Sequence, residues 1–146
     1  MQYLYLEEPT NFKPIFEGVS AFCEFEGEII LLLRQDHKSE WNTYWVPAWK
    51  IEKWETPIEG LKREIREETW LDVDMKDLSF FKKVYWRYPT YDFVYYIFQT
   101  EYFGNRPEVI INPEEHKSFL WMKPKDALAL DLIPGLGECI NLYYWI

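Results

Sequence analysis

Hydrophobic and polar residues alternate in the first part of the chain in a way that predicts strands. Residues 15–25 alternate moderately, and residues 29–32 form an unbroken apolar run. Alternation is typical of a strand with one buried face, and a short apolar run is typical of a strand buried on both faces. A Glu-Gly turn signal at 26–27 lies between them. The pattern therefore predicts a hairpin with strands at 15–25 and 28–34.

One stretch repeats with the period of a helix. Ile58, Leu61 and Ile65 are spaced by three and then four residues, which places them on one helical face. The preceding Thr-Pro-Ile-Glu sequence at 56–59 is a capping box with proline at the first helical position. We therefore expect a helix that begins at residue 57, packs on a core through its apolar side and follows a loop at 47–55.

The second half of the chain predicts another hairpin and a mixture of short elements. Residues 78–88 and 91–100 are rich in Phe, Tyr and Val and are separated by Pro-Thr, which indicates paired strands. The remaining elements that we expect are a short edge strand at 3–5, a loop at 103–113, a strand at 118–122, and helices at 125–129 and 134–144.

Length, charge and cysteine content narrow the class of protein. The chain has 146 residues, which predicts one domain with a real core. Its net charge of −9 disfavours binding to a nucleic-acid polymer, because that role needs a basic surface. Cys23 and Cys139 are too few for a disulfide framework, so we expect buried, reduced thiols in a cytoplasmic protein. We expect neither a signal peptide nor a membrane span.

Three carboxylates on the predicted helix suggest a metal site. Glu64, Glu67 and Glu68 follow the i, i+3, i+4 spacing of one helical face, where like charges repel one another. A divalent cation between them would remove that repulsion, and oxygen ligands suit Mg²⁺ or Mn²⁺. The alternative is a solvated acidic surface. The apolar stripe on the other side of the helix favours the metal site, because it anchors the acidic face in one position.

The stretch from Trp49 to Leu71 resembles the Nudix box. That motif reads Gly, five residues, Glu, seven residues, then Arg-Glu-apolar-x-Glu-Glu-x-Gly-apolar. Here Glu55 stands at the first Glu, and Arg63 with residues 64–71 follows in register, apart from the two glycines. The resemblance implies a single Nudix domain over residues 1–146, with an α/β fold of the α+β type in which a mixed β-sheet is sandwiched between helices.

The resemblance also implies metal ligands. Glu67 and Glu68 would hold Mg²⁺ (or Mn²⁺), and Glu64 would be a further ligand or the base that orients the attacking water. In relatives the backbone carbonyl at the position of Trp49 is a metal ligand. A further Glu from a late loop also ligates metal or acts as the base in relatives, and Glu115, or its neighbour Glu114, fits that place.

Other residues would support the site or contact the substrate. Arg63 would pair with Glu55 and fix the loop against the helix. Glu52 from the loop is a candidate for a substrate contact. Arg34 and Lys38 are candidates for contacts with substrate phosphate, and the alternative for both is a solvated surface. Basic residues and aromatic residues of the second hairpin are further candidates for holding phosphates and for stacking on a base, although core packing is the usual role of such aromatics: Lys82, Lys83, Arg87, Tyr85, Trp86, Tyr88, Tyr91, Phe93, Tyr95, Tyr96 and Phe98. Neither His37 nor His116 has partners at zinc-site spacing.

The implied activity is metal-dependent hydrolysis of a nucleoside diphosphate linked to another group. Family analogy points first to a nucleoside triphosphate, including an oxidised one, cleaved to monophosphate and pyrophosphate. Dinucleoside polyphosphates and nucleotide sugars stay open as substrates. A nucleotide-binding module that has lost turnover is an alternative, and the many aromatics leave a protein-interaction face, and a monomer or a homodimer, open.

Tryptophan replaces glycine at several positions of the motif. Trp49 and Trp70 occupy both box glycines, and Trp45 and Trp54 stand at two further positions where relatives usually have glycine; Trp41 is a possible fifth. The chain has 6 glycines, where ~10 are usual for this length. We hypothesise that a codon read as glycine in the source is translated here as tryptophan. Deliberate engineering would leave the same pattern. We expect reduced stability and weak or absent activity in this version.

Overall fold

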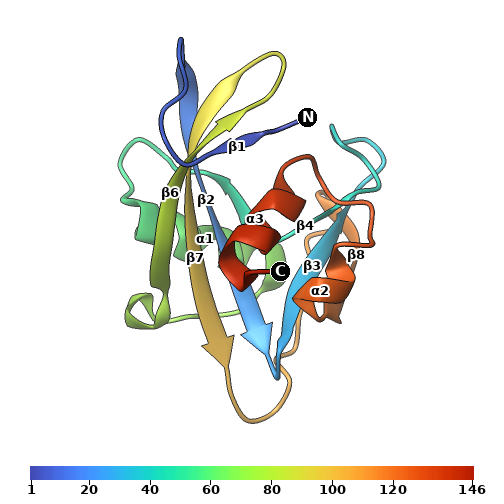
Figure 1. Ribbon diagram of the computed structural model, residues 1–146. Helices are drawn as coiled ribbons and strands as arrows, with labels where there is room; N and C mark the ends of the chain where they lie inside the picture. Colours follow the sequence, from blue (N-terminus) through green and yellow to red (C-terminus); the bar gives the residue numbers. More distant parts are fainter.

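The long strand β2 (Pro14–Phe25) forms the centre of the molecule in the computed structural model, which describes residues 1–146 (Figure 1). It runs parallel to β7 (Asp92–Tyr102) along almost its whole length. It also pairs antiparallel with the short β5 (Ala48–Lys50) through residues 18–20. Its pairing with β3 (Glu28–Arg34) is confined to the hairpin turn, at Glu24 and Phe25. β2 and β3 therefore diverge beyond the turn, and each recruits different neighbours.

These pairings build one mixed, eight-stranded sheet. Its order is β1-β6-β7-β2-β3-β4, with β5 added to β2 and β8 added to β3. The remaining strands are β1 (Leu4–Tyr5), β4 (Tyr44–Trp45), β6 (Ser79–Arg87) and β8 (His116–Met122).

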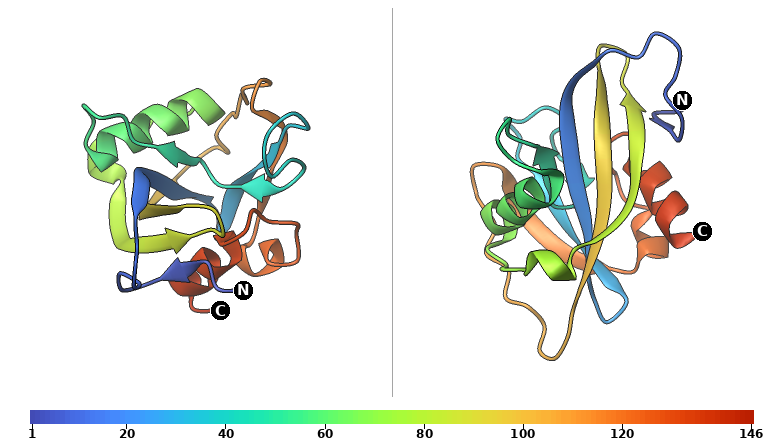
Figure 2. Two further views of the ribbon diagram at one scale, coloured as in Figure 1. Left: turned by 90° about the horizontal axis from the view of Figure 1, so that it is seen from above. Right: turned by 90° about the vertical axis from the view of Figure 1, so that its left-hand side faces the viewer.

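Helices cover both faces of this sheet, as the resemblance implied. α1 (Pro57–Thr69) lies on one face, and α2 (Pro124–Ala127) and α3 (Leu136–Tyr144) lie on the other (Figure 2). A one-turn 3₁₀ helix at Met75–Asp77 connects α1 to β6. No helix combines the length and the apolar character needed to cross a lipid bilayer.

The core has two layers because the strands are buried on both sides. Along β3, Ile29 and Leu31 pack in the layer under α3, whereas Ile30 and Leu32 pack in the layer under α1. Successive side chains of a strand point to opposite faces, so an unbroken apolar run fills both layers. Each helix is thereby fixed by a different set of side chains from the same strands.

Most predicted elements are present, and the differences are one short strand that was predicted as loop and the first residues of β8 and α3. The loop predicted at 47–55 contains β5, whose three residues are held by pairing with β2. β8 begins at His116 and not at 118, because its pairing with β3 extends past a register shift to Arg34. α3 begins at Leu136 and not at 134. The preceding Gly135 has a φ of 99° and packs against Trp86, where a side chain would clash.

The tryptophans at expected glycine positions do not share one environment. Trp70 ends α1 in the left-handed conformation, with a φ of 66°, as expected for a glycine position. Neither Trp49 nor Trp54 has a positive φ. Trp49 lies in β5, whereas Trp54 lies in a turn closed by the hydrogen bond from the Glu55 N–H to the Glu52 carbonyl at 3.0 Å. Trp45 is only 3% exposed and belongs to the core. A residue outside the motif, Trp145, ends α3 in the same left-handed conformation as Trp70.

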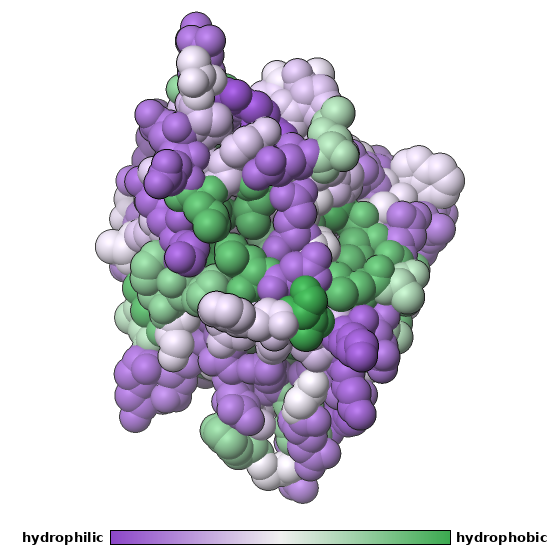
Figure 3. Space-filling view, viewed as in Figure 1, coloured by the Kyte–Doolittle hydropathy of each residue, from purple (hydrophilic) through white to green (hydrophobic).

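The surface around α3 is the less polar part of the molecule in the view of Figure 1. Figure 3 shows hydrophobic residues gathered across the middle of this face, with hydrophilic residues above and below. Since α1 covers the opposite face of the sheet, this apolar area is separate from the acidic helix (Figure 2). Both cysteines, Cys23 and Cys139, are buried and unpaired.

Candidate functional site

The acidic helix α1 is anchored at both ends and along one side. The Thr56 hydroxyl accepts the backbone N–H of Glu59, and the Glu59 carboxylate accepts the backbone N–H of Thr56, which completes the predicted capping box. Leu61 and Ile65 are fully buried against the sheet. This anchoring holds the three predicted carboxylates of α1 in a defined position.

Glu68 is the most enclosed of these carboxylates. It is 6% exposed, and its Oε1 accepts the backbone N–H of Ala48 in β5 at 2.9 Å. Its Oε2 lies 3.7 Å from Nε2 of His116. Burial raises the pKa of Glu68 well above its usual range, and the negative charge of Glu64 raises it further. The charged form of Glu68 is therefore poorly compensated by the protein alone.

Glu64 is also buried, and Glu67 is exposed. The Glu64 carboxylate accepts a hydrogen bond from Nη1 of Arg63 at 2.8 Å, and the same atom reaches Glu67 at 3.2 Å. Burial raises the pKa of Glu64 to about 7, although Arg63 acts in the opposite direction. The Glu67 side chain lines a cavity of about 410 Å³ together with Trp70 and residues 110–112.

Arg63 joins the helix to the loop before it. Its Nε and Nη2 donate to the two carboxylate oxygens of Glu55 at 2.7 and 2.9 Å, and Nη2 also donates to the backbone carbonyl of Lys50 at 3.1 Å. The pairing holds the pKa of Glu55 below its usual value. Glu55 in turn accepts the backbone N–H of Glu52 at 2.9 Å. The contact expected between Arg63 and Glu55 is therefore present, and it fastens the segment 50–55 onto α1.

The turn before β8 brings a further acidic residue, Glu115, to the helix. Glu68, Glu115 and His116 each offer a ligand atom, and these atoms lie within 4.8 Å of one another. Glu114, the alternative to Glu115, is exposed and outside this group. Zinc-motif spacing along the chain did not indicate His116 as a candidate ligand. The signal that could have indicated it is its position directly after Glu115, which was already a candidate ligand.

The remaining predicted residues lie around this group at different distances. Trp49 stands in β5 between Ala48, whose N–H contacts Glu68, and Lys50, whose carbonyl contacts Arg63. Trp49 itself pairs with Val19 of β2. The Arg34 side chain donates to the Ser39 carbonyl, and its positive charge lowers the pKa of Glu68. The Glu52 side chain is exposed.

Lys38 also belongs to the neighbourhood of the candidate metal ligands. Its Nζ lies 3.8 Å from a carboxylate oxygen of Glu115, in a pair that is partly exposed to solvent. Lys38 and Arg34 therefore place two positive charges at the β8 side of the group.

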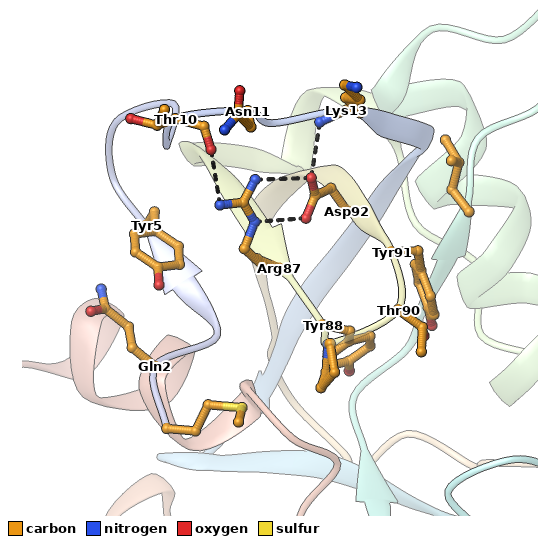
Figure 4. A pocket seen from close by; sticks show the side chains of 13 residues that line it. Gln2, Tyr5, Thr10, Asn11, Lys13, Arg87, Tyr88, Thr90, Tyr91 and Asp92 are labelled. Carbon is orange, nitrogen blue, oxygen red and sulfur yellow. Dashed lines mark hydrogen bonds and ion pairs between the residues drawn. The ribbon is translucent and has the colours of Figure 1, made fainter.

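Arg87 lines a separate cavity at the end of the β6–β7 hairpin. This cavity, of about 690 Å³, is lined partly by Tyr5, Tyr88 and Tyr91 (Figure 4). The Arg87 guanidinium donates to both carboxylate oxygens of Asp92, at 2.9 and 3.1 Å. The guanidinium is thereby occupied inside the fold, which disfavours the phosphate contact considered for it.

The donor set at α1 fits a divalent cation. Three carboxylates, at 55, 64 and 67, contact the single guanidinium of Arg63, and Glu68 on the same helix has no contact with it. Burial raises the pKa values of Glu64 and Glu68. Burying excess negative charge is costly unless a cation compensates it. Carboxylate and carbonyl oxygens are the ligands that Mg²⁺ and Mn²⁺ prefer.

Solved structures share this fold at low sequence identity. The MutT protein from Methanosarcina mazei Go1 superposes with a TM-score of 0.76 at 20% identity, covering 91% of this chain and 95% of the other. A Caenorhabditis elegans Ap4A hydrolase gives 0.67 at 13% identity, covering 90% and 96%. A bifunctional NMN adenylyltransferase/ADP ribose pyrophosphatase from Francisella tularensis, complexed with AMP and a Mn ion, gives 0.74 at 18% identity, covering 93% of this chain and 43% of the other.

Comparison with models of protein families shows which family the chain belongs to. No curated protein matches the chain. The model of the NUDIX domain matches residues 17–143, which include the acidic helix, the loop before it and β8. The chain therefore belongs to the NUDIX family, and it has the fold of a Nudix pyrophosphohydrolase.

Proposed function

We propose that this protein hydrolyses a nucleoside diphosphate linked to another group, in a reaction that depends on Mg²⁺ or Mn²⁺. The observation that carries the proposal is the burial of Glu64 and Glu68 side by side on α1, with the pKa of each raised. A pair of buried carboxylates without enough cationic partners indicates a functional site and not a structural ion pair. The exposed Glu67 lies on the solvent side of the same acidic face of α1.

Each carboxylate has a distinct role in this proposal. Glu68 is oriented by the backbone N–H of Ala48 and is a metal ligand, with Glu67 as a second ligand. Glu64, whose pKa is about 7, is matched to taking a proton from water near neutral pH, or it ligates the metal directly. When bound, the metal polarises the phosphoryl oxygens and stabilises the charge that develops there.

The surrounding residues position these groups. Arg63 keeps Glu64 and Glu67 in place and holds the loop at 50–55 through Glu55, so its role is structural. The resemblance to the family makes the backbone carbonyl of Trp49 a further candidate ligand, although the groups of β5 that contact α1 are the Ala48 N–H and the Lys50 carbonyl. Glu115 would approach the same ion from the turn before β8.

The substrate that we propose first is a nucleoside triphosphate, including an oxidised one, cleaved to monophosphate and pyrophosphate. A MutT protein, an Ap4A hydrolase and an ADP ribose pyrophosphatase share the fold. Dinucleoside polyphosphates and ADP-ribose-like compounds therefore belong in the substrate panel beside the triphosphates.

The test is an assay of phosphate and pyrophosphate release over that panel, with Mg²⁺, with Mn²⁺ and with a chelator. We expect turnover of at least one substrate only with metal, and a loss of roughly 100-fold in Glu67→Gln and Glu64→Gln. Glu8→Gln, which changes an exposed glutamate between β1 and β2, should retain activity. Equal silence of wild type and Glu67→Gln, with nucleotide still bound, would identify a binding module instead.

A further inference from the structure

His116 is a buried side chain without a hydrogen-bond partner. It is 1% exposed, and its Nδ1 is buried and unpaired. Its Nε2 lies 3.7 Å from the nearest carboxylate oxygen of Glu68, which is longer than an N–H···O hydrogen bond. Nε2, the nitrogen that faces Glu68, therefore has no hydrogen bond to the protein chain, and an ion between the two groups would satisfy it.

The groups nearest to His116 are those that bind metal. One carboxylate oxygen each from Glu68 and Glu115 lies with the imidazole nitrogen inside a span of 4.8 Å. Ligands that share one ion at about 2.0–2.2 Å are separated from each other by roughly 3 to 4.4 Å. The observed spacing is therefore close to what three ligands of one ion require.

The main chain around His116 is fixed before any ion binds. The backbone N–H of His116 donates to the Asn112 carbonyl at 2.9 Å, and the Glu115 carbonyl accepts the backbone N–H of Gln35 at 2.9 Å. His116 also pairs with Arg34 in the β3–β8 register. The imidazole is thus held on a strand edge that faces α1.

We propose that His116 is a nitrogen ligand to a divalent ion that Glu68 and Glu115 also bind. The inference deepens the proposed function and rests on it, since that function places a divalent ion at Glu68. An imidazole donor suits Mn²⁺, Co²⁺ or Zn²⁺ better than Mg²⁺, so the mixed nitrogen and oxygen set selects a transition ion at this position. Lys38, at 3.8 Å from Glu115, is displaced from that carboxylate when the ion enters.

The two histidines of the chain allow a direct test. His37 is exposed, and His37→Gln leaves His116 as the single histidine. Untagged His37→Gln protein is prepared twice, with ¹⁴N-histidine and with ¹⁵N-histidine, and loaded with Mn²⁺ for pulsed EPR. We expect an electron–nuclear coupling of a directly bound imidazole nitrogen that changes with the isotope.

The outcomes separate this inference from the proposed function. Bound Mn²⁺ without a histidine coupling overturns the role of His116 and leaves metal binding on α1 intact. No bound Mn²⁺ overturns the role of His116, whereas the proposed function is then decided by turnover with Mg²⁺ against turnover in chelator. Because this arm keeps His116 unchanged, it decides the question even if variants at 116 fail to fold.

A binding titration tests the selectivity. In His116→Gln, checked for folding by circular dichroism, calorimetry should show Mn²⁺ affinity weakened by roughly 10- to 100-fold or more, and Mg²⁺ affinity little changed. His37→Gln, the matched control, should bind both ions as wild type does. Equal weakening for both ions, or no change for either, contradicts the proposed selectivity.

Discussion

Arg63 and Glu55, eight residues apart, form a two-pronged ion pair: Nε donates to Oε2 at 2.7 Å and Nη2 donates to Oε1 at 2.9 Å. The pair lies between the helix that has the metal-binding carboxylates and the loop that leads into it. Because the same guanidinium also reaches the Lys50 carbonyl, one side chain sets the distance between loop and helix. The carboxylates proposed as catalytic are thereby positioned by a residue that need not touch the substrate.

Arg63→Lys should weaken this junction although it preserves the charge, because an ammonium cannot form the two parallel bonds. We expect a loss of about 1–2 kcal/mol in the free energy of unfolding and a lower activity. Urea denaturation of Arg63→Lys, Glu55→Gln and the double variant measures the coupling between the two residues. Additive effects would show that the pair contributes nothing of its own.

Trp70→Gly should stabilise the protein. Trp70 has a φ of 66°, a conformation that costs a bulky residue roughly 1–2 kcal/mol and glycine almost nothing. The Arg66 guanidinium lies 4.3 Å from the Trp70 ring, and losing this contact offsets about 0.5–1 kcal/mol. The expected net gain is about 1 kcal/mol, visible as a rise of roughly 2–4 °C in the melting temperature.

The other tryptophans supply the controls for that measurement. Trp145→Gly, at the second left-handed helix end, should also stabilise. Trp54→Gly should give no gain, since Trp54 is 80% exposed and has no positive φ. If Trp54→Gly raised the melting temperature as much as Trp70→Gly, backbone strain would not be the cause.

Restoring glycine together at 45, 49, 54 and 70 should raise activity. Trp70 lines the same cavity as Glu67, and Trp49 lies beside the acidic helix. A tenfold or larger rise in metal-dependent turnover is expected if their bulk obstructs the site, since a misplacement of about 1 Å can cost 10²-fold. Trp45 is only 3% exposed, so its replacement alone should cost about 3–5 kcal/mol in the free energy of unfolding unless the core repacks.

The hypothesis of a recoded glycine codon has its own test. Ordinary tryptophan codons at all four positions of the native gene would rule out recoding.

The metal-free protein should reveal the raised pKa of Glu64 through its pH dependence. Its pKa is about 7 in the fold against 4.5 ordinarily, so between these values the folded state binds more protons and the free energy of unfolding falls as pH rises. Burial lowers the pKa of His116 from 6.5 to about 4. Between these pH values the folded state binds fewer protons at His116, so this group makes the free energy of unfolding rise with pH.

Comparison with Glu64→Gln removes the shared His116 contribution. In chelator, the variant should gain stability relative to wild type as pH rises from about 4.5 to about 7 and then level off. Mg²⁺ or Mn²⁺ should reduce the difference, because the ion compensates the charge that the variant lacks. A difference that is constant with pH would show that Glu64 titrates normally.

Local patterns determined the helix and the positions of its candidate ligands. The capping box, the apolar stripe at 58, 61 and 65, and the acidic spacing at 64, 67 and 68 all lie within one helical segment, where neighbours in sequence are neighbours in space. The unbroken run at 29–32 likewise indicated a strand buried on two faces. These features depend on periodicity alone, so the sequence was sufficient for them.

Only the tertiary structure decided which distant residues meet that helix. β5 was predicted as loop because three residues have no periodicity, and its strand character comes from pairing with β2. His116 reaches Glu68 because β8 pairs with β3 from His116, two residues before its predicted start. The burial that raises the pKa of Glu64 and Glu68 also depends on what packs over them. Such contacts join residues tens of positions apart, and no local spacing encodes them.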